Sequence, residues 1–76
     1  MITVKAILRA IGNDKLELFR GNGYYYFTYD DLEVNKIWAD ESVYVCRLNH
    51  LDLNRWIEIG KEFINKVETE NNIKGN

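Results

Sequence analysis

The sequence has one cysteine, one histidine and no proline among its 76 residues. A single cysteine excludes an internal disulfide, which fits a reducing compartment. Cys46 and His50 are too few for a structural zinc site, which takes four ligands. They are also the one nucleophile–base combination that the chain offers, and we favour a packed or edge cysteine beside a surface histidine. We therefore expect no enzymatic activity, no metal and no cofactor.

Long apolar runs and an excess of basic residues are also missing. The N-terminal stretch ITVKAILRAIG contains Lys5 and Arg9 and is too short and too polar for a membrane span or a signal segment. The net charge of −2 argues against general nucleic-acid binding, which needs several basic groups to replace phosphate counterions. We expect a cytosolic protein without membrane contacts.

The length allows one domain, for which we predict residues 1–67, followed by a polar tail at 68–76 that frays. A domain of this size has a small core. The aromatic share of 13% enlarges that core, because each buried ring removes roughly 150–250 Å² from water. Dimerisation is a second way to gain buried surface, and it remains an alternative.

Two helices are predicted from apolar residues at helical spacing. The first is short, with Thr3 as N-cap and Gly12 in the left-handed position after its end. Its apolar face consists of Val4, Ile7, Leu8 and Ile11. The second is long and amphipathic, with Asp52 as N-cap. Its apolar face consists of Leu53, Trp56, Ile57, Gly60, Phe63, Ile64 and Val67. A glycine inside a helix costs about 1 kcal/mol relative to alanine, so Gly60 indicates a close approach to the sheet or to a bulky neighbour.

The segment between the helices predicts antiparallel strands. Residues 15–20 and 24–29 form a hairpin around Gly21-Asn22-Gly23, with Gly21-Asn22 or Asn22-Gly23 as a two-residue primed turn. Ser42–Arg47 is β-branched and aromatic and reads as the last strand, without an indication of which face is buried. A short fourth strand at Lys36–Trp38 is an option. The order of elements predicts an α+β two-layer domain, with three or four antiparallel strands and the long helix packed on one sheet face.

Either turn gives the hairpin the same two faces. One face, with Leu16, Leu18, Tyr25, Phe27 and Tyr29, has no charge and is the predicted core. The other face is mixed and carries Lys15, Glu17, Phe19, Tyr24, Tyr26 and Thr28. Residues 30–41 then hold five acids against Lys36 alone, and we interpret them as a loop-rich, solvated connection.

Three stretches resemble small uncharacterised proteins of bacteriophages and prophages: GNGYYYFTYDD (21–31), SVYVCRLNHLDLNRW (42–56) and EIGKEF (58–63). The resemblance brings no established chemistry and no site residue. It implies a setting, because small acidic phage proteins often bind and block a host protein in the host cytosol. Anti-CRISPR proteins and other inhibitors of host defence are examples.

We therefore expect a non-enzymatic mobile-element protein that binds a host protein or complex, such as an anti-CRISPR. The expected contact residues are Phe19, Tyr24 and Tyr26 as anchors, with Asp30, Asp31, Glu33, Asp40 and Glu41 as the charged part. Aromatic residues are enriched at protein interfaces, which favours this interpretation. One alternative is a single-stranded nucleic-acid-binding module that stacks bases on the same rings. Another is a homodimeric structural or regulatory phage protein with this face as its subunit interface.

Overall fold

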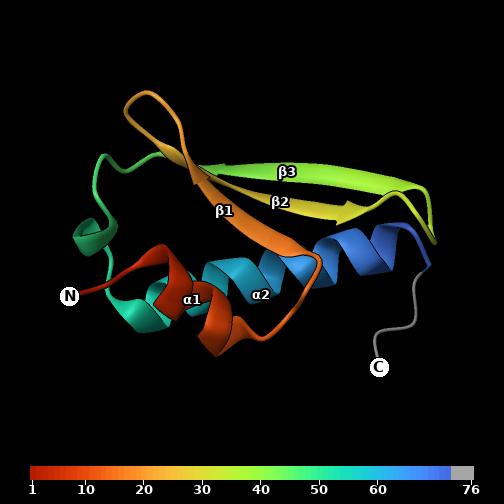
Figure 1. Ribbon diagram of the computed structural model, residues 1–76, viewed down its shortest axis with the longest axis horizontal. Helices are drawn as coiled ribbons and strands as arrows, with labels where there is room; N and C mark the ends of the chain where they lie inside the picture. The colour runs from red at the N-terminus through yellow and green to blue at the C-terminus, as the bar shows by residue number, and fades with distance from the viewer. Residues whose placement is uncertain (73–76) are drawn as a thin grey trace.

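The computed structural model describes residues 1–72 and has the predicted α+β architecture (Figure 1). The elements in chain order are α1 (Val4–Ile11), β1 (Leu16–Arg20), β2 (Tyr25–Asp31), β3 (Ile37–Val43), the 3-10 turn η1 (Leu48–His50) and α2 (Leu53–Glu70). The three strands pair antiparallel in the order β1-β2-β3. Both helices lie on the same side of the sheet, so the domain has two layers.

The short helix α1 forms as its capping residues predict. The hydroxyl oxygen of Thr3 accepts a hydrogen bond from the backbone N–H of Ala6 at 3.1 Å. At the other end Gly12 takes a left-handed conformation, with φ 76°, and its N–H donates to the carbonyl of Leu8 at 2.9 Å. A cap of this kind satisfies backbone groups that have no partner inside the helix.

The hairpin uses Asn22-Gly23 as its loop. The register pairs Arg20 with Tyr25 and Phe19 with Tyr26, and the N–H of Gly21 donates to the carbonyl of Tyr24 at 2.8 Å. Gly23 has φ 83°, whereas Asn22 is not among the residues with positive φ. The expectation of a primed turn was therefore wrong, since primed turns of types I′ and II′ both need positive φ at the first loop position.

The core lies between the sheet and the helices, on the hairpin face that the sequence predicted. Its buried apolar residues are Ile7, Leu16, Leu18, Tyr25, Phe27, Tyr29, Val43, Trp56, Phe63 and Val67. The ring of Trp56 meets those of Tyr25 and Phe27 edge-on, with centroids 5.8 and 6.1 Å apart. Its indole N–H donates to the carbonyl of Leu48 at 2.7 Å, which fixes η1 against the core.

Helix α2 begins at the predicted cap, because the Asp52 carboxylate accepts from the N–H of Arg55 at 2.8 Å. Gly60 lies against α1 and the sheet: a Cβ there would be 2.4 Å from Cδ1 of Ile11 and 3.4 Å from the ring of Phe27. This confirms that the close packing at Gly60 requires a residue without a side chain.

The same helix continues to Glu70, beyond the predicted domain boundary at Val67. Glu68 is part of the fold, since its carboxylate accepts a hydrogen bond from the Tyr29 hydroxyl at 3.2 Å. Burial of the phenol, the hydrogen bond and the charge of Glu68 raise the pKa of Tyr29 to about 12. The last part of the predicted tail, 73–76, lies outside the described residues.

The last strand was predicted in the wrong place. β3 covers Ile37–Val43 instead of 42–47, and it absorbs the short strand suggested at 36–38. Its final pair joins Val43 to Tyr25, beyond which β2 gives way to the hairpin turn. The N–H of Val45 then donates to the carbonyl of Val43 at 2.9 Å, which bends the chain away. Val43 is buried and Tyr44 is exposed, so this part of the chain turns Val43 inward.

Candidate protein-binding surface

The sheet face opposite the helices, here called the outer face, carries one residue set from each strand. Because cross-strand partners share a face, the register defines its members. They are Glu17 and Phe19 from β1, Tyr26, Thr28 and Asp30 from β2, and Trp38, Asp40 and Ser42 from β3, with Tyr24 and Tyr44 at the hairpin end. No described helix covers this face (Figure 1).

Four aromatic rings form a continuous row on the outer face. Phe19 and Tyr26 are direct cross-strand partners with ring centroids 5.5 Å apart. Tyr24 follows at 5.9 Å from Tyr26, and Tyr44 at 6.1 Å from Tyr24. The structure thus brings the three predicted anchors together, and it adds Tyr44 to them.

The row ends in strongly exposed rings. Phe19 is 45% exposed and Tyr44 is 84% exposed. Trp38, which is outside the row at the other end of β3, is 53% exposed. Tyr24 and Tyr26 are half-buried against their neighbours. Contiguous exposed aromatic surface of this kind is typical of interaction sites on small proteins.

Gly21 makes room for the ring of Tyr24. A Cβ at Gly21 would lie 2.5 Å from Cζ of Tyr24, a separation that real side chains do not show. The missing side chain therefore lets the Tyr24 ring lie back over the strand end, between Tyr26 and Tyr44. The sequence indicated the turn at this glycine but not its contact with the ring.

The predicted acidic connection is mostly strand, which corrects its interpretation as a loop. Only Leu32–Lys36 connects β2 to β3, and Glu33 is exposed there. Neighbouring residues in a strand point to opposite faces, so each acidic pair is divided. Asp30 and Asp40 lie on the outer face, whereas Asp31 and Glu41 lie on the helix-facing side.

Asp31 is buried at the end of β2 and holds the connection to β3. Its carboxylate accepts a hydrogen bond from the side-chain amide of Asn35, and its carbonyl accepts from the N–H of the same residue at 3.2 Å. Glu41 pairs with Phe27 and faces Ile59, Phe63 and Lys66 across a small hollow. Neither carboxylate lies beside the aromatic row.

The outer face is acidic between its aromatic ends. Glu17 and Asp40 are the cross-strand partners of Thr28 on either side. Asp30 follows Thr28 on the same face of β2 and pairs with Trp38. Lys15 precedes β1 and its carbonyl accepts from the N–H of Asp30 at 3.0 Å. The face therefore carries three carboxylates and, at its margin, one ammonium group.

Sequence reasoning missed Trp38, Tyr44 and Glu17 as members of the candidate surface. Glu17 was on the correct face but was not selected. Trp38 and Tyr44 lie at two-residue spacing from Asp40 and Ser42 and so share their face, a signal that becomes readable once β3 is known to begin at Ile37.

Cys46 lies in the segment that follows β3, and His50 lies in η1. The Cys46 thiol is exposed and lies 3.7 Å from the carbonyl of Gly23, while His50 ends η1. Within residues 1–72, no three His, Cys, Asp or Glu side chains are grouped so that they could hold a metal ion.

Comparison with known proteins gives no family for this chain: no protein-family model, curated protein or solved structure matches it. Neither helix described by the structure combines the length and the apolar character needed to cross a membrane.

Proposed function

We propose that this protein is a non-enzymatic binding module that contacts another protein through its outer face. The observation that carries the proposal is the continuous row of Phe19, Tyr26, Tyr24 and Tyr44 on a sheet face without a covering helix. Tyrosine and tryptophan supply most of the binding energy at many protein interfaces, because they bury a large area with few rotatable bonds.

The charges of the outer face favour a partner with a basic surface. Glu17, Asp30 and Asp40 lie among the aromatic residues, and carboxylates in this position attract arginine and lysine side chains. Exposed rings also bind cations through their faces. A basic surface that normally holds nucleic acid is a partner of this chemistry, and the resemblance to phage proteins suggests one that belongs to a host defence complex, as for an anti-CRISPR.

The same charges count against the two alternatives. A nucleic-acid strand would bring phosphates to a face with three carboxylates, although the aromatic row suits base stacking. A face-to-face homodimer would place the carboxylates of one copy close to those of the other. Both alternatives remain outcomes of the experiment below.

The test is capture from bacterial lysate with and without nuclease treatment, compared between three forms of the full chain. The first form is the natural protein, and the second carries Phe19→Ser and Tyr44→Ser, both at exposed positions of the row. The matched control carries Val34→Ser, because Val34 is 76% exposed but lies in the β2–β3 connection. We expect a host protein that the natural and control forms retain and the double variant loses.

Other results would contradict the proposal in distinct ways. Equal capture by the double variant would place the contact elsewhere on the molecule. Capture that disappears with nuclease would indicate nucleic acid. Recovery of this chain alone, with a dimeric mass by light scattering, would make the outer face a subunit interface.

A further inference from the structure

A cleft of about 560 Å³ opens at the end of the domain near the hairpin, on the helix side of the sheet. Its walls come from four parts of the chain: the N-terminal residues, the ends of β1 and β2, the segment after β3, and η1. The lining residues are Met1, Ile2, Arg20, Tyr25, Cys46, Arg47, Leu48 and Asn49. None of them belongs to the outer face. The volume is in the range of small-molecule sites, roughly 300–1,000 Å³.

The cleft is basic, although the whole chain has a net charge of −2. Arg20 and Arg47 both line it, and no described lining residue is acidic. The one ion pair among residues 1–72 joins Arg55 to Glu58 on α2, so neither cleft arginine is neutralised by a carboxylate there. Two guanidinium groups without a counter-ion in one concave site favour an anionic ligand.

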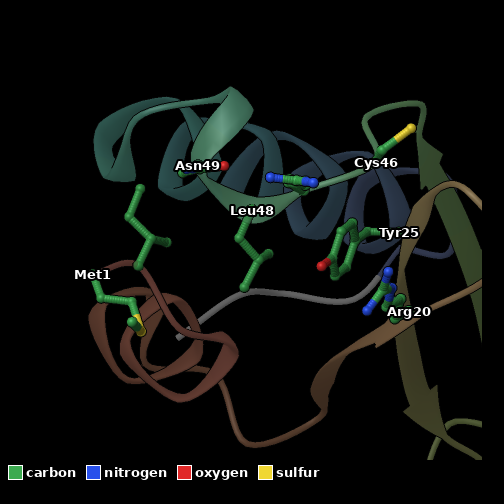
Figure 2. A pocket seen from close by; sticks show the side chains of 8 residues that line it. Met1, Arg20, Tyr25, Cys46, Leu48 and Asn49 are labelled. Atoms are coloured by element: carbon green, nitrogen blue, oxygen red, sulfur yellow. The ribbon is translucent and has the colours of Figure 1, made fainter.

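A polar group and an apolar wall complete the cleft. Tyr25 is 7% exposed, and Figure 2 shows its ring between Arg20 and Leu48 with the hydroxyl directed into the cleft. Ile2 and Leu48 supply apolar surface. A ligand that fits these groups has a charged end for the arginines and a short hydrocarbon part for the opposite wall.

The core holds the walls of the cleft in position. Trp56 is fully buried, packs edge-on against Tyr25 with centroids 5.8 Å apart, and donates its indole N–H to the carbonyl of Leu48. One side chain thus links the sheet wall of the cleft to the η1 wall. A site organised before the ligand arrives loses less conformational entropy on binding.

We propose that this cleft binds a small organic anion, a carboxylate or a phosphate monoester with a short apolar group, with Arg20 and Arg47 binding the charge. The inference is independent of the proposed function, because it concerns other residues and another side of the sheet. Failure of one leaves the other standing.

The test is an NMR titration of the full chain, with backbone amide shifts recorded against hexanoate, hexyl phosphate and uncharged hexanol. We expect saturable shifts around Tyr25 and Leu48 with at least one of the two anions. Hexanol is expected to bind on the order of tenfold more weakly, since it lacks the charge-assisted hydrogen bonds. Binding of hexanoate alone identifies a carboxylate site, binding of hexyl phosphate alone a phosphate site, and binding of both a site for either anion.

Variants of exposed arginines supply the controls. Arg20→Gln with Arg47→Gln is expected to weaken anion binding on the order of tenfold or more, without a change in the urea midpoint. Arg9→Gln, on the exposed side of α1 and outside the cleft, is expected to leave anion binding unchanged. Absence of saturable binding by both anions, equal binding of hexanol, or full binding by the double variant would overturn the proposal.

Discussion

The rings of Tyr24 and Tyr44 lie 6.1 Å apart at the hairpin end of the sheet, where Tyr24 precedes β2 and Tyr44 follows β3. The contact extends the aromatic row across the sheet and onto a segment outside it. Buried rings on the other face of the same hairpin hold the fold together, so the two sets of aromatic residues have different roles.

The first prediction separates these roles by stability. Tyr44→Ser is expected to change the free energy of unfolding by no more than about 0.5 kcal/mol, because the side chain is exposed. Leu18→Ala, in the core beside Phe27, is expected to lower it by about 2–5 kcal/mol. Urea unfolding followed by tryptophan fluorescence measures both. A loss for Tyr44→Ser as large as that for Leu18→Ala would mean that the outer face is structural.

The second prediction concerns the glycine that positions Tyr24. Gly21→Ala is expected to push the Tyr24 ring out of the row, since the new Cβ would lie 2.5 Å from its Cζ. The nuclear Overhauser contacts between Tyr24 and Tyr44 should then weaken. Asn22→Ala, in the adjacent turn position, is the control and should preserve them. Unchanged contacts in Gly21→Ala would show that the ring does not need this space.

The third prediction uses the raised pKa of Tyr29, which is about 12 in the folded protein against about 10 in an unfolded chain. The folded state keeps the Tyr29 proton to a higher pH than the unfolded chain does. The contribution of the protonated Tyr29 to stability is therefore complete below about pH 10 and is lost as the pH rises toward 12. Urea midpoints measured across this window should fall for the natural protein and less steeply for Tyr29→Phe. Tyr26→Phe, on the outer face, should retain the fall. The same alkaline slope in all three forms would contradict the assignment.

The fourth prediction is a double-mutant cycle at the contact between the helices. Gly60→Ala gains about 1 kcal/mol of helix propensity but crowds Cδ1 of Ile11, and overpacking costs about 1–3 kcal/mol. We expect a net loss of stability in the natural background. Ile11→Val removes the crowded methyl group, so Gly60→Ala should become less harmful by about 1 kcal/mol in that background. Additive effects would show that another atom limits the space at Gly60.

The helices and the hairpin faces were predictable because their signals are local. Thr3 and Gly12 supply hydrogen bonds to backbone groups at the two ends of α1, whatever that helix packs against. Asp52 does the same at the N-terminus of α2. The alternation from Leu16 to Tyr29 gave the core face directly, since both possible turns preserve it.

The third strand was harder to predict because pairing overruled local propensity. Ser42–Arg47 has the more β-branched and aromatic composition, but β2 offers no paired residue beyond Tyr25. Ile37–Val43 contains acids that are tolerated because β3 is an edge strand, where Glu41 reaches solvent although it faces the helix side. Because of this error, the acidic residues of the strands were assigned to a loop, and Trp38 and Tyr44 were not recognised as members of the outer face.

The cleft was not predictable from the sequence. Arg20, Tyr25 and Arg47 carry no motif, and they meet through tertiary contacts of η1 such as the hydrogen bond from Trp56 to Leu48.

Contact between the outer face and another protein can be detected by site-specific photo-crosslinking in bacterial cells. The photoreactive residue p-benzoylphenylalanine would replace Tyr44 in one form and Val34 in a matched control, both exposed, the first in the aromatic row and the second in the β2–β3 connection. We expect a covalent adduct with a defined host protein from position 44 and none from position 34. No adduct from position 44, an equal adduct from position 34, or an adduct only with a second copy of this chain would contradict it.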